Sequence, residues 1–425
     1  MGLLAGVAAS LLAAQAPAST GGAQGLNCLS STLCDSGALP SIVAKLRNAA
    51  RAGAPVHILQ IGDSHTAGDM ITNGYRVRLQ SRYGNGGRGV LAGGRPYSGY
   101  ITFGVTASQS SGWSVNSLFG SRYSEQGPSL GLSGFTQSAR SAGETLGVAT
   151  DSPDFNFDRM IVCAVTGPGR GAVSLRLGGV EQSWSLDAPT RGAACRTVES
   201  LQPVSSASVT TLDANPVSIT SFGTFRRQGG VIVSNVGVVG AQLVHFGRTD
   251  DEVIRQELAA YRPDLIVVAY GTNEGFGARG RPDEYEADLR NQIARIRRAA
   301  GQRVPIMLLG APDAASRNAS TGSGCGAGWY TPGFLGDVRN IQRRVARELG
   351  LGYWDWEQAM GGRCASQAWL SQGLMRGDMV HFTRQGGDRI GAMIFGDLER
   401  ATTAPTFQHP AAPPQPAPSV RRRPN

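Results

Sequence analysis

The chain has 425 residues, of which 41% are hydrophobic and 17% charged, so it can form one or two domains with a packed core. Its formal net charge of +9 comes almost entirely from arginine, since Lys45 is the only lysine. No basic helix or basic–aromatic motif accompanies this charge, which argues against a nucleic-acid partner. Attraction to an anionic envelope polymer or membrane surface explains the charge equally well, and so does a merely solvated surface.

The six cysteines and five histidines bear on the compartment and on metal binding. An even number of cysteines fits an oxidising compartment, where disulfides persist. The sequence has no Cys-x-x-Cys and no His-x-x-x-His, so we expect no metal ion. Six cysteines allow 15 pairings, so the sequence alone leaves the connectivity open. We favour the pairing that keeps each bond within one predicted region: Cys28–Cys34, Cys163–Cys195 and Cys325–Cys364.

The first 37 residues are expected to be a secretion signal followed by a flexible lead. Residues 3–14 are apolar and are followed by small residues at 16–18, a pattern that resembles a secretory signal without its basic start. The apolar run is shorter than the ~20 residues of a membrane span, and no other stretch is long enough, so we expect no transmembrane segment. Beyond the lead, Ser41 is expected to cap a helix that ends near Gly53.

A short apolar run over 56–61 predicts a strand buried in a parallel sheet, and it stops at Gly62-Asp63-Ser64. The looser apolar spacing that follows is compatible with a helix. A serine at a strand-to-helix turn lies at the carboxyl edge of the sheet, near helix N–H groups that favour developing negative charge. Ser64 is therefore a candidate nucleophile, although a serine at such a turn often only caps the helix.

Helical periodicity is lost between about 100 and 227, where short strands alternate with turn residues. Residues 160–165 and 172–177 are expected to be two strands joined by a tight connection. This pattern predicts an antiparallel β-sandwich. Trp113 and Trp184 could stack on sugar rings, but tryptophan in such a domain more often belongs to the core. The further strands expected here and just beyond are 182–186, 195–198, 207–212, 216–221 and 231–233.

From residue 231 onward, strands and helices alternate, which predicts a parallel sheet with helices on both faces. The apolar run 265–270 is expected to be a strand that leads to Asn273. A helix is expected over 335–349, and Thr383 is expected to cap a closing helix. Residues 402–425 are rich in proline, alanine and arginine, a composition typical of a disordered tail.

Four short blocks stand in order along the chain: Gly-Asp-Ser-His around Ser64, Val-Val-Gly-Ala around Gly240, Gly-Thr-Asn-Glu around Asn273, and Asp378-Met-Val-His381. This order of Ser, Gly, Asn and Asp-x-x-His resembles the SGNH (GDSL-like) hydrolase superfamily. The extended first block and the position of the β-rich insertion are most similar to the bacterial peptidoglycan O-acetylesterases. The resemblance covers about 40–95 and 230–400.

The resemblance implies an α/β fold with a flavodoxin-like parallel sheet, helices on both faces and an inserted antiparallel β-sandwich that is similar to a carbohydrate-binding module. The division that we expect is a signal and lead at 1–37, a hydrolase domain in two parts at 38–99 and 228–401, the insert at 100–227 and the tail at 402–425.

The resemblance also implies a role for each block. Ser64 would be the nucleophile, His381 its general base and then the acid for the leaving alcohol, and Asp378 the group that orients and stabilises the imidazolium. The oxyanion hole would combine the backbone N–H groups of Ser64 and Gly240 with the side-chain amide of Asn273.

The other polar residues near these blocks are interpreted as non-catalytic. Asp63 is expected to bond loop N–H groups, and Asp69 is given no catalytic role. His65 follows the nucleophile and is expected to point elsewhere, while His57 and His245 are interpreted as ordinary strand or loop histidines.

The function expected from the resemblance is removal of O-acetyl groups from an envelope polysaccharide, with peptidoglycan as the substrate, by a secreted or periplasmic serine esterase without cofactor or metal. The partner is then the acetylated polymer, and the oligomeric state is left open. Activity should rise with pH as His381 loses its proton. The alternatives are a lipase or acyl esterase, a polysaccharide O-acetyltransferase, and a non-catalytic glycan-binding protein on a hydrolase fold.

Overall fold

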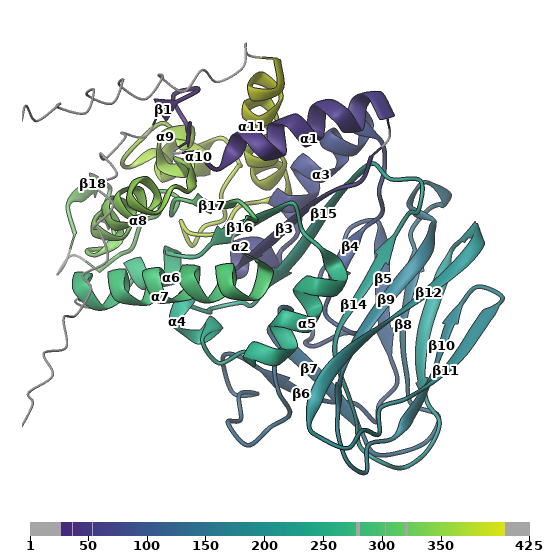
Figure 1. Cartoon of the computed structure of the whole chain (residues 1–425). Helices are drawn as coiled ribbons and strands as arrows, with labels where there is room; N and C mark the ends of the chain where they lie inside the picture. Colours follow the sequence, from purple (N-terminus) through teal and green to yellow (C-terminus); the bar gives the residue numbers. More distant parts are fainter. Residues whose placement is uncertain are drawn as a thin grey trace, which may run out of the picture.

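The computed structural model describes residues 27–35, 37–52, 54–277, 281–301, 303–318 and 322–403. The expected secretion signal and nearly all of the expected tail lie outside these residues. A seven-stranded sheet forms the centre of the α/β part (Figure 1). Its five strands from β20 to β15 are parallel, and β1 and β2 add an antiparallel edge. In pairing order the strands are β1 (Asn27–Cys28), β2 (Leu33–Asp35), β20 (Gly352–Trp354), β17 (Ile306–Leu309), β16 (Leu265–Ala269), β3 (Val56–Gly62) and β15 (Val231–Gly237).

Helices cover both faces of this sheet, as the alternation of strands and helices predicts (Figure 1). In β3, Val56 and Ile58 pack into one core while Leu59 and Ile61 pack into the other, because successive side chains point to opposite faces. The first core includes α1 (Leu39–Ala52), α3 (Met70–Tyr83) and α11 (Arg384–Thr403), and the second includes α5 (Asp251–Tyr261), α7 (Pro282–Ala300) and α8 (Leu335–Leu349).

The N-terminal edge of the sheet corrects two expectations. Residues 27–35, expected within the flexible lead, form β1 and β2 and pair with β20. Helix α1 begins at Leu39, before Ser41, and its first N–H groups are satisfied by the carboxylate of Asp35, which accepts from Ala38 and Leu39 at 2.8 and 3.0 Å. The closing helix does start as expected, since the Thr383 hydroxyl accepts from the Gly386 N–H at 3.1 Å.

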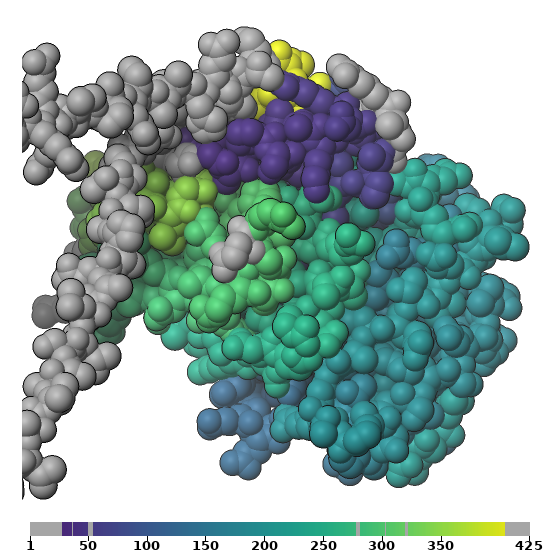
Figure 2. All heavy atoms as spheres, viewed as in Figure 1, coloured from purple at the N-terminus to yellow at the C-terminus, as the bar shows by residue number. Residues whose placement is uncertain are grey.

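The β-rich insertion forms two antiparallel sheets that pack over a shared apolar core. It lies directly against the α/β part (Figure 2), because Leu130 and Ile161 share a core with Ile254 and Leu258 of α5. One sheet has the order β12 (Gly192–Val204), β9 (Phe157–Thr166), β14 (Val217–Phe225), β7 (Phe135–Ala139) and β6 (Ser114–Ser117), with β4 (Gly89–Leu91) beside β14; the other has β11 (Val180–Ser185), β10 (Ala172–Leu177), β13 (Ser206–Thr211), β8 (Thr145–Thr150) and β5 (Val105–Gln109).

The structure shows how two consecutive strands of the insertion are placed and where its two tryptophans lie. The strands β9 and β10 do not pair with each other, because the short connection between them crosses from one sheet to the other. Trp113 and Trp184 are only 6% and 5% exposed and belong to the core between the sheets, so neither presents a ring face to a sugar.

All three predicted disulfides are confirmed: Cys28–Cys34, Cys163–Cys195 and Cys325–Cys364. The second joins facing residues of β9 and β12. The third ties the small hairpin formed by β18 (Gly324–Gly326) and β19 (Trp329–Tyr330) to the start of α10 (Ala365–Ser371). The remaining elements are α2 (Ser64–Ala67), α4 (Leu243–Phe246), α6 (Thr272–Gly275), α9 (Trp356–Met360) and the 3-10 turn η1 (Pro153–Phe155). Within the described ranges, no helix is long and apolar enough to span a membrane.

Candidate active site

The first block lies at the carboxyl end of β3, in the middle of the parallel sheet. Strand β3 ends at Gly62, and α2 begins two residues later at Ser64. A side chain at Gly62 would come within 2.5 Å of the Ala269 carbonyl oxygen, so only glycine lets β3 and β16 approach here. The carboxylate of Asp63 accepts the His65 N–H at 2.9 Å, which fits the structural role expected for it. This turn holds Ser64 half-buried at the edge of the sheet.

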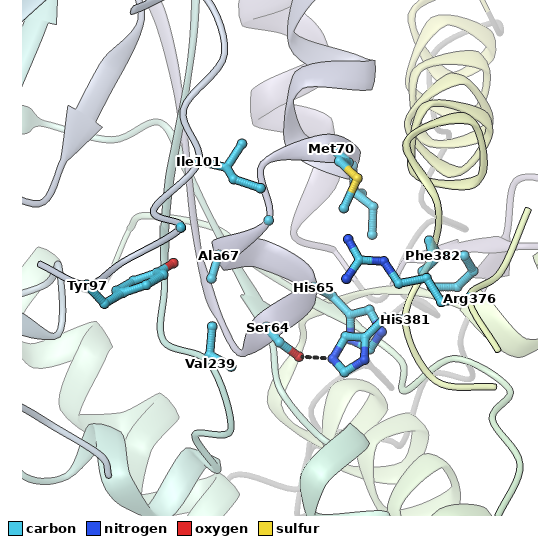
Figure 3. Close-up of a pocket in the computed structure, with 13 residues that line it drawn as sticks. Ser64, His65, Ala67, Met70, Tyr97, Ile101, Val239, Arg376, His381 and Phe382 are labelled. Atoms are coloured by element: carbon cyan, nitrogen blue, oxygen red, sulfur yellow. Dashed lines mark hydrogen bonds between the residues drawn. The ribbon is translucent and has the colours of Figure 1, made fainter. Parts of the chain in front are cut away.

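Ser64, His381 and Asp378 form one hydrogen-bonded chain although 317 residues separate the serine from the histidine. Ser64 Oγ lies 2.9 Å from His381 Nε2 (Figure 3), and His381 Nδ1 lies 2.8 Å from Asp378 Oδ2. The other carboxylate oxygen of Asp378 accepts the backbone N–H groups of Val380 and His381, both at 2.9 Å. Burial alone would raise the pKa of Asp378, but these hydrogen bonds outweigh it and lower that pKa. The carboxylate is therefore charged where it meets the imidazole.

The turn that carries this pair has an unusual backbone at Met379, whose φ is +58°. Residues other than glycine are disfavoured in this left-handed region, typically by about 1–2 kcal/mol. The conformation is held because the Met379 side chain is buried, its N–H donates to the Arg376 carbonyl, and its own carbonyl accepts the Ala315 N–H at 3.0 Å. The strained turn presents Asp378 and His381 on the same side, toward Ser64.

The second and third blocks lie on the strands that flank β3. Gly240 follows β15, Asn273 follows β16, and both strands pair directly with β3. Gly240 has a φ of +77° in a turn closed by the Ala241 N–H on the Val238 carbonyl, and a side chain there would lie 2.7 Å from the ring of Phe119. The position therefore requires glycine.

Asn273 is joined directly to the second block. Its Nδ2 donates to the carbonyl of Ala241 at 2.9 Å, so the amide is fixed beside the Gly240 turn. A primary amide carries two N–H donors, and this bond uses one of them. The structure thus brings the serine, glycine and asparagine blocks to neighbouring strand ends.

His65 departs from the expectation that it points away from the site. Its ring is buried, and its centroid is 5.5 Å from that of His381. Its Nδ1 lies 3.2 Å from Asp63 Oδ1, and its Nε2 lies 3.0 Å from the carbonyl oxygen of Val380. Burial works to lower the pKa of His65, but the Asp63 carboxylate and the Val380 carbonyl outweigh it and raise that pKa. The side chain thus fastens the Asp378–His381 turn to the nucleophile turn, and no local signal indicates this because its partner is 315 residues away.

The other two histidines among the described residues, His57 and His245, are away from the reacting groups, as expected. The His57 ring is buried between Ser234 and the Tyr261 carbonyl, and burial lowers its pKa to about 4. His245 accepts the Gln242 N–H at the start of α4. Among the described residues, no group of three or more histidine, cysteine, aspartate or glutamate side chains is placed to hold a metal ion.

A cavity of about 250 Å³ opens beside Ser64 and His381 (Figure 3). Its walls are mainly apolar, and Arg376 supplies a cation on the side of His381. Gly240 and Asn273 lie outside this lining. The residues that line the cavity are Ser64, His65, Ala67, Gly68, Met70, Ile71, Tyr97, Gly99, Ile101, Val239, Arg376, His381 and Phe382. A serine hydrogen-bonded to a histidine at the edge of a small apolar cavity is suited to attack on the carbonyl of a short acyl ester.

Part of the sequence matches a family of known proteins. Residues 223–389 match the model of the GDSL-like lipase/acylhydrolase family, a range that holds Gly240, Asn273, Asp378 and His381 but begins after Ser64. No curated protein matches the sequence.

Among solved structures, the chain is similar to one described as a peptidoglycan O-acetylesterase in action, with 28% identity, a TM-score of 0.72, and coverage of 87% of this chain and 99% of that one. A family two carbohydrate esterase from Clostridium thermocellum matches with 11% identity, a TM-score of 0.27, and coverage of 68% of this chain and 98% of that one. The latter likeness is too weak for any inference about this chain. Together these matches support an ester-bond hydrolase that is similar to the GDSL-like (SGNH) enzymes, with an α/β fold and an inserted antiparallel domain.

Proposed function

We propose that the protein removes O-acetyl groups from an envelope polysaccharide and that its substrate is O-acetylated peptidoglycan. The observation that supports this reaction is the hydrogen-bonded series Ser64–His381–Asp378 beside a small apolar cavity. The choice of substrate rests on the similarity to the peptidoglycan O-acetylesterase structure over almost the whole of both chains. The division into 38–99, 100–227, 228–401 and flanking segments remains part of the same proposal.

The mechanism that we assign begins with Ser64. Its Oγ attacks the carbonyl carbon of the acetyl ester while His381 Nε2 takes the hydroxyl proton, and Asp378 stabilises the imidazolium. The oxyanion accepts hydrogen bonds from the backbone N–H groups of Ser64 and Gly240 and from the Asn273 amide. The bond to the sugar oxygen then breaks as His381 returns the proton to that oxygen. The acetyl group stays on Ser64.

Deacylation repeats these steps with water as the nucleophile. His381 takes a proton from water as the oxygen attacks the acetyl-serine, and acetate leaves as Ser64 regains its proton. His65 holds the turn of His381 against the nucleophile turn during both halves of the reaction.

We place the protein in the cell envelope or outside the cell. Three disulfides support an oxidising compartment. The apolar N-terminal segment supports export, although it lies outside the described residues.

The test is acetate release from O-acetylated peptidoglycan by the purified wild-type protein and by the Ser64→Ala variant, with 4-nitrophenyl acetate as a second substrate. We expect acetate from the polymer with the wild type and none above background with the variant. Cleavage of the aryl ester without release from the polymer would keep Ser64 as nucleophile and overturn the substrate. Transfer to a sugar in preference to water would indicate a transferase, and binding without any turnover would indicate a glycan-binding protein.

A further inference from the structure

We propose that the cavity at Ser64 continues into a second binding site, which takes the neighbouring sugar units of the same anionic glycan strand. This inference rests on the proposed function and extends it from the ester to the polymer. The second site is a separate cavity of about 350 Å³, formed by the segment after β4, the loop after β6 and the turn after β15.

The two cavities are adjacent, because Tyr97 and Val239 line both of them. In Figure 3 these two side chains lie on the side of Ser64 opposite Arg376. Val239 is 53% exposed although it is hydrophobic, and it lies beside the Gly240 turn. A strand whose ester reaches Ser64 would therefore pass over Tyr97 and Val239 into the second cavity.

The lining of the second cavity fits a sugar ring. Tyr97 and Phe119 provide aromatic surface for the apolar C–H face of a ring, while Ser98 and Ser121 add hydroxyl groups beside it. Phe119 is held in place by His245, with ring centroids 4.5 Å apart. Phe119 also lies over Gly240, so an occupant of the second site would contact the ring that covers a proposed oxyanion donor.

The charges of the groove favour an anionic polymer. Arg122 lines the second cavity and is exposed, while Arg376 lines the first cavity. Of the described residues, no aspartate or glutamate lines either cavity. A guanidinium can bind a carboxylate with two parallel N–H bonds, so each cavity has a group suited to a carboxylate of the strand or of its substituents.

The test compares Arg122→Gln with Arg122→Lys and with Arg176→Gln as a matched control. Arg176 is an exposed arginine on β10, in the sheet of the insertion that contributes no residue to either cavity. In Figure 1, β10 lies on the side of the insertion away from the parallel sheet. The steady-state constants are measured on O-acetylated peptidoglycan fragments and on 4-nitrophenyl acetate. We define the ratio as kcat/KM for the fragments divided by kcat/KM for 4-nitrophenyl acetate. We expect Arg122→Gln to lower this ratio about tenfold, mainly because KM for the fragments rises. Arg122→Lys should recover part of this loss, and Arg176→Gln should leave the ratio at the wild-type value.

An unchanged ratio in Arg122→Gln, or an equal loss on both substrates, would overturn the inference. A separate measurement does not need turnover. Calorimetry measures the affinity of the same fragments for the Ser64→Ala protein and for the double variant that also carries Arg122→Gln. Weaker binding with the second change supports the site, and equal affinity contradicts it. Failure of the proposed function would instead show as a wild-type protein that cleaves the aryl ester and releases no acetate from the fragments.

Discussion

The buried carboxylate of Asp69 stabilises the segment that follows the nucleophile, and its removal gives a measurable prediction. Asp69 is fully buried and pairs with two buried arginines, Arg76 and Arg88, the latter at 2.8 Å. It also accepts the Thr72 hydroxyl at 2.6 Å and the Phe103 N–H at 2.9 Å. Burial would raise the pKa of Asp69, but the two guanidinium groups outweigh it and lower that pKa.

The informative change is Asp69→Asn, because asparagine keeps the shape and tolerates the left-handed backbone of this residue, whose φ is +53°. The change removes the negative charge and leaves the guanidinium groups of Arg76 and Arg88 buried without a counter-charge. Breaking a buried ion pair from one side typically costs about 3–5 kcal/mol. We expect the free energy of unfolding to fall by about that amount at neutral pH.

The measurement is urea unfolding of the wild type, Asp69→Asn and the control Asp388→Asn. Asp388 also binds an arginine, Arg78, through two hydrogen bonds of 2.7 and 2.9 Å, but its side chain is 52% exposed. Loss of an exposed pair typically costs no more than about 1 kcal/mol. Equal losses in Asp69→Asn and Asp388→Asn would refute the account of a stabilising buried cluster.

The pH dependence provides a second readout on the same variants. Because the pKa of folded Asp69 lies below its unfolded value of about 3.9, its contribution is complete above that value. The contribution is lost as the pH falls through the folded pKa. The wild type should therefore lose stability in acid more steeply than Asp69→Asn, and parallel curves would contradict this assignment.

Three further predictions concern the site and one core histidine. Asp378→Asn should lower kcat for aryl ester hydrolysis about 10³–10⁴-fold, because the amide no longer holds the imidazole in the required tautomer; a loss below tenfold would contradict the triad. Asn273→Ala should lower kcat about 10²–10³-fold with little change in KM, because one oxyanion donor is lost, and a change confined to KM would argue against this role. Burial lowers the pKa of folded His57 to about 4, so between about pH 6.5 and 4 only the unfolded chain takes up this proton. The free energy of unfolding of the wild type should therefore fall as the pH is lowered through this range. Its slope should exceed that of His57→Gln by up to about 1.4 kcal/mol per pH unit, which unfolding curves at several pH values would measure.

Much of the α/β fold could be predicted because its signals are local. The apolar runs of β3 and β16 are long enough to stand out, and helix α8 follows its periodicity from Leu335 to Leu349. For β15, only the first three of its residues were expected to be a strand. Strand β2 was missed because three residues show no periodicity, and it is a strand only because β20 pairs with it. The tight connection expected between β9 and β10 is present, but strand spacing alone does not say that the two strands lie in different sheets.

Part of the candidate site could also be predicted from the sequence, and part could not. The four blocks indicate which residues meet because each follows a strand or lies in one turn, and parallel strand ends lie along one edge. The position of His65 depends on the Val380 carbonyl, far away in the sequence, so adjacency to Ser64 gave the wrong expectation. The second cavity joins the segments of Tyr97, Phe119 and Val239, and nothing in their local sequence predicts that they meet.

The central claim is that Ser64 is the nucleophile activated by His381, and covalent labelling tests it most directly. The protein is treated with an alkyl fluorophosphonate, which reacts with activated serines, and its mass and labelled peptide are determined by mass spectrometry. The account predicts one label per chain, on Ser64, with none in Ser64→Ala and much slower labelling in His381→Ala. An unlabelled wild-type protein, or a label on another serine, would contradict it.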